Sequence, residues 1–545
     1  MIPRRSVPLV REDASEFLSR AQRAILLMVI WVVAISIVSA SLGILPARWF
    51  GLKAVLILLI ALMTVSYVGV IWYKSMLVLR GAREPARRGS LRTLEEVSAA
   101  RYTILVPLYK EAAVLSQLIM NLQSINYPHD KLQVLVLVED DDLETITALG
   151  AIALPNYFEI VLVPESFPRT KPKACNVGLE HANGEFCVIY DAEDRPDPDQ
   201  LWQALDAFAR APRKVVCVQA ELQYFNPSTN VLTRWFAAEY ALNFSLMLPG
   251  LTRSGAPVPL GGTSNHFRTA ILRELGGWDG FNVTEDADLG IWIARAGLQV
   301  EMIDSVTWEE ANSKPGNWIR QRSRWIKGYL QTYLVHMRHP ITLGRQLGVR
   351  NFWSFQCMVG GTPLTLLVNP VFWLLTVAYV GFGQHWVSAV FPTPVLYLGV
   401  FSMIVGNLLT LWFQMAACMK RGLYPSVKWL LAVPAYWVLM SMAAFKALGQ
   451  LLNPRLRHHW EKTTHGLVAD EHAIMSVPLY GAGQETPTAQ IAPMISVPAQ
   501  RGPSGGEYLL PVAQTRTTVH VLLPAQGERR STRPLDAEAV GEGAV

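Results

Sequence analysis

The sequence predicts an α/β domain built on a mostly parallel sheet and inserted between α-helical transmembrane segments. Short apolar runs alternate with helix-compatible segments through the middle of the chain, which is the pattern of a sheet covered by helices on both faces. Long apolar stretches lie before and after this region, and 51% of the 545 residues are hydrophobic. Soluble globular chains are seldom so apolar, so we expect the flanking stretches to lie in a membrane.

Two apolar stretches near the N-terminus, 24–46 and 54–74, are each long enough to cross a bilayer. Five arginines precede the pair and five follow it, whereas the turn between the stretches holds two basic residues. Because basic residues stay on the cytoplasmic side, we expect a basic cytosolic N-terminus over 1–23 and an uncleaved transmembrane hairpin over 24–78. The domain that follows, 95–345, is then predicted to be cytosolic.

Three further apolar stretches, 353–382, 393–418 and 428–452, predict transmembrane or interfacial helices across 346–452. The third stretch can be interpreted in two ways. If it crossed the membrane, the basic run at 453–459 would lie on the non-cytoplasmic side, although basic residues usually stay on the cytoplasmic side. Either this stretch lies along the membrane surface, or an extra crossing is hidden in the first of the three.

The net charge, the cysteines and the C-terminal composition narrow the class of protein. A formal net charge of +5 argues against a nucleic-acid binder driven by bulk charge. The five cysteines are scattered without C-x-x-C spacing, so they predict neither a disulfide framework nor a zinc site. Residues 467–545 are rich in Pro, Gly, Gln, Thr and Ala with few aromatic residues, which predicts a disordered tail.

The middle of the chain holds the apolar runs that we expect to form strands. They are 102–107, 133–138, 158–163, 186–190 and 214–219. Helix-compatible segments such as 111–125 and 198–210 separate them. In such sheets, ligands bind beyond the carboxyl ends of the strands, so the residues that follow each run are the candidates for a site.

Charged residues follow these runs, and their pattern predicts a metal ion and a nucleotide. The polar residues singled out there are Tyr109, Glu111, Glu139, Asp140, Lys173, Asp191 and Glu193. Clustered acidic residues repel one another, and Mg²⁺ takes oxygen ligands from carboxylates and substrate phosphates. Asp191 and Glu193 are spaced to hold one ion, with Lys173 balancing phosphate charge, which suits a nucleoside diphosphate. The absence of a P-loop and of a G-x-G-x-x-G motif argues against a P-loop NTPase and a dinucleotide site.

Two motifs farther along predict a base and a cationic helix near the membrane. Thr284, Glu285 and Asp286 open a helical run, in which Asp286 would take a proton from an acceptor hydroxyl. The alternative is a helix N-cap with acidic first-turn residues, and both interpretations can hold at once. The run QRSRW at 321–325 suits either a diphosphate and a sugar ring or an interfacial anchor at headgroup depth.

In this order, VPLYKE, EDDD, KPKACN, YDAED, TED and QRSRW resemble the motifs of a processive family 2 glycosyltransferase. That group contains cellulose, hyaluronan and chitin synthases and kindred bacterial exopolysaccharide synthases. The resemblance covers about residues 80–466 and implies a GT-A fold with a mixed, mostly parallel sheet. The family's D-x-D motif reads DAE at 191–193, a departure that bears on the geometry of the metal site.

The resemblance implies a role for each matching residue. Tyr109 and Glu111 would border the uridine pocket, and the family's first aspartate would fall at Glu139 or Asp140. Lys173 would lie at the diphosphate, and Asp191 and Glu193 would hold the metal. Asp286 would be the base, with Glu285 and Asp191 beside it. In the QRSRW motif, Gln321 and Arg324 would lie at the leaving group and Trp325 at the acceptor sugar.

Together these expectations describe a multi-pass enzyme of a bacterial-type inner membrane with a cytosolic catalytic domain. It would be an inverting, Mg²⁺- or Mn²⁺-dependent glycosyltransferase that builds a β-linked polysaccharide from a UDP-sugar, with export partner proteins and no nucleic acid. Transfer of one sugar to a membrane lipid is the alternative, and a receptor domain that has lost its chemistry is a rival from another class. Segment 453–466 resembles a gating loop, or else it is a basic loop that touches anionic lipid.

Overall fold

The computed structural model describes most of the chain. The described residues are 11–43, 52–83, 99–383, 391–459, 461 and 521–522. The predicted tail, 467–545, lies outside this set except for Val521–Leu522. Residues 1–10 of the predicted cytosolic N-terminus, much of the predicted hairpin turn and most of the second half of the gating-like segment also lie outside it.

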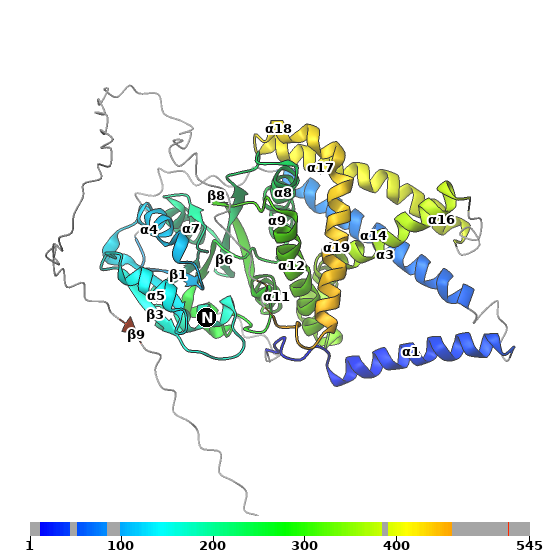
Figure 1. Cartoon of the computed structure of the whole chain (residues 1–545), viewed down its shortest axis with the longest axis horizontal. Helices are drawn as coiled ribbons and strands as arrows, with labels where there is room; N and C mark the ends of the chain where they lie inside the picture. Colours follow the sequence, from blue (N-terminus) through cyan, green and yellow to red (C-terminus); the bar gives the residue numbers. More distant parts are fainter. Residues whose placement is uncertain are drawn as a thin grey trace, which may run out of the picture.

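A mixed sheet forms the centre of the α/β domain (Figure 1). In spatial order its strands are β5 (Arg195–Pro196), β8 (Gln299–Glu309), β6 (Val215–Tyr224), β7 (Asn265–Arg268), β4 (Phe186–Ile189), β1 (Tyr102–Leu108), β2 (Leu132–Glu139), β3 (Phe158–Val163) and β9 (Val521–Leu522). Pairing is parallel between β1 and β2, β1 and β4, β2 and β3, β3 and β9, and β6 and β8. β7 is antiparallel to both β4 and β6, and β5 to β8. The predicted mixed, mostly parallel sheet is therefore confirmed.

Helices pack on both faces of this sheet. They include α4 (Leu115–Gln123), α5 (Leu143–Gly150), α6 (Lys171–His181), α7 (Gln200–Arg210), α8 (Val231–Leu242), α10 (Thr269–Glu274) and α11 (Glu285–Arg295). Leu105 of β1 packs in one core with Leu179 of α6. Its neighbour Ile104 packs in the opposite core with Leu118 of α4 and Leu201 of α7. Because both faces are buried, the strands read as continuous apolar runs, which is why the sequence predicted them.

Five helical stretches of the described chain are long and apolar enough to cross a membrane, judged by length and composition. They are Arg20–Ser39, Lys53–Ala82, Pro340–Tyr379, Thr393–Lys420 and Tyr424–Leu452. In Figure 1, α1 (Arg20–Ser41), α3 (Leu52–Ala82), α14 (Gly361–Thr376), α16 (Thr393–Phe401) and α17 (Asn407–Lys420) extend away from the sheet on one side. The stretch that contains α14 begins with α13 (Pro340–Phe355), which is broken at Gly348.

The helix α3 is packed directly onto the α/β domain. Its Gly81 lies against the π-helical turn η4 (Asn243–Met247), where an added Cβ would come 1.8 Å from the carbonyl oxygen of Leu246. Gly250 of α9 (Leu248–Arg253) approaches α3 in the same way, since an added Cβ would lie 2.1 Å from the Leu77 oxygen. Glycine alone permits these two contacts, so α3 and the α/β domain share a close interface.

The helix α19 (Val433–Leu452) runs across the other membrane-side helices and along α12 (Pro315–His336) (Figure 1). Ahead of α19, the carbonyl of Trp429 accepts a hydrogen bond of 2.9 Å from Trp235 Nε1 of α8. Beyond it, the carbonyls of Leu456 and His459 accept hydrogen bonds from Lys327 Nζ of α12 at 3.1 and 2.9 Å. Both ends of this segment therefore contact the α/β domain.

Candidate active site at the carboxyl ends of the strands

A cavity of about 460 Å³ opens beyond the carboxyl ends of β1, β2 and β4 and continues to the membrane-side helices. Ten of the twelve residues that the sequence singled out line it. They are Tyr109, Glu111, Glu139, Asp191, Glu193, Glu285, Asp286, Gln321, Arg324 and Trp325. The fold thus brings residues as far apart in sequence as Tyr109 and Trp325 to one chamber.

Two of the predicted residues, Asp140 and Lys173, do not line this cavity. Asp140 accepts a hydrogen bond of 3.2 Å at Oδ2 from the backbone N–H of Glu165. Lys173 Nζ donates at 2.7 Å to Oε2 of Glu139, on the outer side of the strand end. Residues two apart on a helix point to different sides, so at the start of α6 Lys171 faces the cavity and Lys173 does not.

Lys171 is the cation closest to the acidic cluster. Its Nζ forms an ion pair with Oδ1 of Asp191 and donates a hydrogen bond of 2.7 Å to the carbonyl of Gly262. Burial lowers the pKa of Lys171, but the carboxylates of Asp191 and Glu285 outweigh burial, so this pKa lies above its usual value. Lys171 therefore stays charged and offsets part of the negative charge at the strand ends. The sequence analysis expected Lys173 at the phosphates, and the structure places Lys171, from the same motif, at the cavity instead.

Glu285 and Asp286 form the first turn of α11, and both line the cavity. Burial and the neighbouring Asp286 carboxylate raise the pKa of Glu285 to about 8. Burial raises the pKa of Asp286 to about 6, although the Ala287 N–H, 2.8 Å from Oδ1, and Lys171 oppose this rise. Near neutral pH, Glu285 then carries a proton and Asp286 is ionised, as a base must be. Thr284 occupies the N-cap position, but its side chain makes no capping hydrogen bond.

Asp194 is a buried acid of the same cluster to which the sequence assigned no role. Its Oδ2 accepts a hydrogen bond of 2.7 Å from the backbone N–H of Asp191 and is also hydrogen-bonded to Thr263 Oγ1. Thr263 Oγ1 donates to this Oδ2 and also lies 3.0 Å from the carbonyl oxygen of Ile189. Burial and the charges of Asp191 and Glu193 raise the pKa of Asp194 well above its usual range. Asp194 therefore braces the turn that carries Asp191.

Asp191 and Glu193 present carboxylate oxygens to the cavity, the ligands that Mg²⁺ and Mn²⁺ take in proteins. Within the described ranges, no three His, Cys, Asp or Glu side chains lie close enough together to hold an ion by themselves. An ion here would complete its shell with nucleotide phosphate oxygens and water. Burial and the charges of Asp194, Glu193 and Asp191 raise the pKa of Glu309 well above its usual range. The shift reflects negative charge on the neighbouring carboxylates, which a cation would offset.

The helix α12 brings Gln321, Arg324 and Trp325 to the cavity wall. Gln321 is held in place by Asn312, whose Nδ2 donates to its Oε1 at 2.9 Å. Burial lowers the pKa of Arg324, while the carboxylates of Glu285 and Asp191 act in the opposite direction. Since a guanidinium keeps its charge in proteins, Arg324 places a fixed positive charge opposite the acidic cluster.

Arg322, which the sequence did not single out, fixes the orientation of this helix. Both of its terminal nitrogens bind the carboxylate of Glu239 on α8, one of them at 3.1 Å. Its guanidinium also lies 4.6 Å from the centre of the Trp325 ring. Trp325 stacks in addition on Tyr240, with ring centroids 6.2 Å apart and planes 29° apart. Phe236 is a third ring partner, with its centroid 6.1 Å from that of Trp325, so the protein itself already covers part of the indole face that a sugar would use.

Toward the membrane, the cavity wall becomes mostly apolar. Its lining there includes Met247, Met358, Pro363, Leu366 and Met440, from η4, the π-helical turn η5 (Gln356–Gly360), α14 and α19. Lys74 of α3 and Thr362 of α14 are polar residues of this part, and Lys74 Nζ donates to Thr362 Oγ1 at 3.1 Å. We refer to this part, lined by residues 247, 358, 362, 363, 366 and 440, as the membrane-side chamber.

Comparison with known proteins agrees with this site. Residues 99–328 match the family model described as glycosyltransferase like family 2. These residues form a family 2 glycosyltransferase domain. The match includes the predicted site residues, from Tyr109 to Trp325, and ends inside α12.

Relatives of the glycosyltransferase domain include proteins with different product names. The chain is 25% identical over 277 residues to a probable glycosyltransferase, YdaM, of Bacillus subtilis, covering 50% of this chain and 64% of that protein. It is 26% identical over 272 residues to a β-monoglucosyldiacylglycerol synthase of Trichormus variabilis, covering 49% and 56%. It is 28% identical over 235 residues to a probable glucomannan 4-β-mannosyltransferase of Arabidopsis thaliana, covering 41% and 42%. The matched part is less than two thirds of each of these relatives' length.

Proposed function

We propose that the protein is a membrane-bound, metal-dependent, inverting glycosyltransferase that uses a nucleotide sugar, with a UDP-sugar as the first candidate. The observation that carries the proposal is that one cavity holds an ionisable base, a metal-type carboxylate pair and a fixed guanidinium, at Asp286, Asp191 with Glu193, and Arg324. The orientation with the glycosyltransferase domain in the cytosol of a bacterial-type inner membrane belongs to the same proposal. It is supported by the basic residues on both sides of the hairpin.

In this reaction the carboxylate of Asp286 accepts the proton of an acceptor hydroxyl. The freed oxygen attacks the anomeric carbon of the donor sugar, and the bond from that carbon to the diphosphate oxygen breaks. The leaving diphosphate carries away the electron pair, and the charges of Arg324 and Lys171 stabilise it. A divalent cation held by Asp191 and Glu193, when bound, would neutralise further charge on the diphosphate. Attack from the face opposite the leaving group inverts the anomeric centre.

The membrane-side chamber favours a lipid as the acceptor. Its Met, Leu and Pro side chains suit an acyl or isoprenoid chain better than a polar glycan, and the chamber opens toward the membrane helices. Trp325 already packs against Tyr240 and Arg322, which leaves it less free to stack on a sugar. The name of the Trichormus relative, a β-monoglucosyldiacylglycerol synthase, agrees with a lipid acceptor.

A growing β-linked polysaccharide is the second candidate acceptor. The observation in its favour is that Gln321, Arg324 and Trp325 stand together at the cavity wall, as the resemblance to processive synthases implies. The glucomannan-type relative agrees with a polymer product. Product size therefore separates the two candidates.

The test is an assay of radiolabelled product in inside-out membrane vesicles, with a panel of UDP- and GDP-sugars and with Mg²⁺ or Mn²⁺. The product would be partitioned between organic solvent and water and then sized, beside an Asp286→Asn control. A single-sugar, solvent-extractable product that disappears in the control would support lipid transfer. Long, water-soluble or insoluble polymer from one donor would support the polysaccharide. No incorporation from any donor, in vesicles supplied with total lipid and oligosaccharide acceptors, would overturn the proposal.

A further inference from the structure

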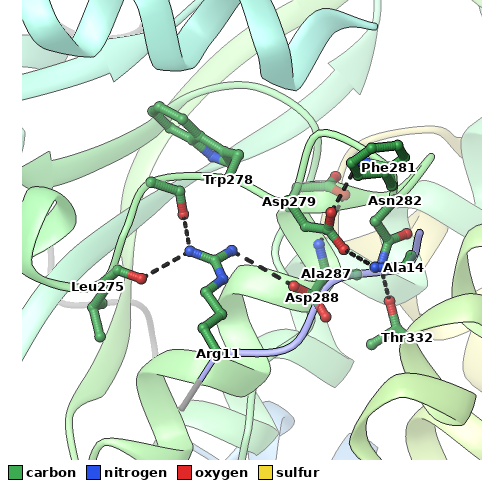
Figure 2. A network of polar contacts seen from close by, with 12 residues as sticks. Arg11, Ala14, Leu275, Trp278, Asp279, Phe281, Asn282, Ala287, Asp288 and Thr332 are labelled. Atoms are coloured by element: carbon green, nitrogen blue, oxygen red, sulfur yellow. Dashed lines mark hydrogen bonds and ion pairs between the residues drawn. The ribbon is translucent and has the colours of Figure 1, made fainter. Parts of the chain in front are cut away.

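The segment that precedes the first membrane helix lies against the loop that carries the proposed base. We call residues 11–19 the N-terminal strap and residues 275–284 the base loop, since the latter ends where Glu285 and Asp286 begin α11. Figure 2 shows the strap crossing beneath this loop. The two segments are about 265 residues apart in sequence, as the hydrogen bonds between them record.

Arg11 binds the start of the base loop and the helix α11 that follows the loop. Its Nη1 donates hydrogen bonds to the carbonyls of Leu275 at 2.8 Å and Gly277 at 2.6 Å (Figure 2). Its Nη2 lies 3.7 Å from Oδ2 of Asp288, in the first turn of α11. The Arg11 side chain is 19% exposed and that of Asp288 is fully buried, so water screens this ion pair little. One guanidinium thus connects the start of the loop to the helix at its end.

A second contact holds the middle of the base loop. The backbone N–H of Ala14 donates to Oδ2 of Asp279 at 2.7 Å, while Oδ1 of Asp279 accepts the N–H of Phe281 at 2.9 Å (Figure 2). Asp279 therefore ties the strap to the turn that leads to Asn282. Asn282 in turn accepts the N–H of Thr284 at 3.1 Å. The chain of bonds reaches the residue next to the Glu285–Asp286 pair.

The strap is itself anchored to the residues that follow α12 and leads into α1. Glu12 forms an ion pair with Arg338 at 3.7 Å, and its Oε1 lies 3.1 Å from Nε2 of His339. Gln22, in the first turn of α1, donates to the carbonyl of Leu334 near the end of α12 at 2.8 Å. The same helix α12 carries Arg324 to the opposite side of the cavity. The strap therefore spans from the membrane helix α1 to the two helices that hold the base and the guanidinium.

We infer that Arg11 is a positioning residue for Asp286, and that the strap sets the geometry of the base from the membrane side. This inference rests on the proposed function. Arg11 touches neither substrate nor reacting atoms in this arrangement; it acts by fixing the base loop and the axis of α11. Its loss should therefore slow the chemical step and leave the binding of the donor nucleotide nearly unchanged.

The test compares Arg11→Met, Arg11→Lys and Arg20→Met in the full-length protein in vesicles. Arg20→Met is the matched control, because it removes an exposed cation from the same stretch ahead of the membrane. We expect Arg11→Met to lower kcat by about 10- to 100-fold, the usual cost of a displaced catalytic group, with the KM for the donor within about twofold. Arg11→Lys keeps the positive charge but loses the planar set of N–H donors of the guanidinium, so its kcat should lie between those of Arg11→Met and the wild type. Arg20→Met should behave as the wild type.

Hydrogen–deuterium exchange provides a readout that needs no activity. In Arg11→Met and Arg11→Lys, the peptide that covers residues 275–288 should exchange faster, while peptides from β1 and β2 should not change. Unchanged exchange of that peptide, or unchanged kcat despite faster exchange, would overturn the inference. A wild type that transfers no sugar would overturn the proposed function, and the exchange result would still decide whether Arg11 holds the loop.

Discussion

The ammonium group of Lys171 is paired with the carboxylate of Asp191 just beyond the end of β4. This pair is the point where the amino end of α6 meets the acidic cluster, and Glu285 is close enough to contribute to its electrostatics. Lys171 is therefore placed to do two things. It keeps the cluster partly neutral before a donor binds, and it faces the departing diphosphate afterwards.

Replacing Lys171 by Met should lower kcat/KM by about 10²-fold, the usual cost of losing one group that stabilises developing charge. Lys173→Met is the matched control from the same motif, and we expect it to cost less, because Lys173 binds Glu139 but does not itself line the cavity. Initial rates with a radiolabelled nucleotide sugar measure both variants. A larger loss from Lys173→Met than from Lys171→Met would return the diphosphate role to Lys173.

The pH dependence should follow the ionisation of Asp286. A base must be deprotonated, and burial raises the pKa of Asp286 to about 6, so kcat/KM should fall as the pH drops through that value. Glu285→Gln should show the same fall in kcat/KM at acidic pH. The reason is that the Gln amide resembles the protonated form of Glu285, which is the form expected near neutral pH. Rates across the mildly acidic to mildly alkaline range measure the limb. A flat profile through pH 6 would contradict a buried carboxylate base.

Removing divalent metal should abolish transfer, and the acidic residues should differ in their response. Asp191→Asn and Glu193→Gln should each raise the Mn²⁺ concentration for half-maximal rate by about tenfold or more, since each removes a charged ligand. Asp194→Asn should shift it less, because Asp194 does not line the cavity. Rates after chelation and stepwise addition of Mn²⁺ measure the shift. Equal shifts in all three variants would mean that Asp191 and Glu193 have no special role.

The interfacial position proposed for α19 predicts that both of its ends face the same side as the glycosyltransferase domain. The five cysteines are buried, which allows single cysteines to be labelled at exposed sites. Pro425→Cys and Arg455→Cys should react with an impermeant maleimide from the same side as Leu143→Cys in the α/β domain. Leu42→Cys, at the far end of α1, is the reference for the opposite side. Labelling of Arg455→Cys from the Leu42 side would show that this segment crosses.

The membrane-side chamber predicts a defect in acceptor use when it is narrowed. Leu366→Trp adds bulk inside the chamber, whereas Leu364→Trp, two residues earlier, adds it at a position that is 41% exposed. We expect Leu366→Trp to raise the KM for the acceptor by about tenfold, while hydrolysis of the donor in the absence of acceptor stays within about twofold. Leu364→Trp should change neither. An equal effect of both variants would argue that the chamber does not receive the acceptor.

The sequence predicted five of the strands, β1, β2, β3, β4 and β6, and most of the cavity wall, because both depend on local patterns, but it missed β8 and β9. Strands buried on both faces read as apolar runs, and the residues after them meet at one edge. It did not predict β7, which is short and polar in part, with His266 and Asn265 buried among its four residues. It assigned the diphosphate to Lys173, whereas Lys171 faces the cavity, because that choice depends on where α6 begins. It also could not place Arg11 beside Asp288, because that contact is set by tertiary structure alone.

The side chains of Arg322, Glu239 and Tyr436 meet where α12, α8 and α19 come together. Trp235, Trp318 and Tyr436 belong to the same apolar core, so the glycosyltransferase domain has no separate core at this face. Cutting the chain after α12 would leave the Arg322–Glu239 pair without its third member and would expose large aromatic side chains to water. If the apolar helices lie in a bilayer, as proposed, the lipid becomes a structural neighbour of the cavity, and the thickness and fluidity of the bilayer should affect turnover.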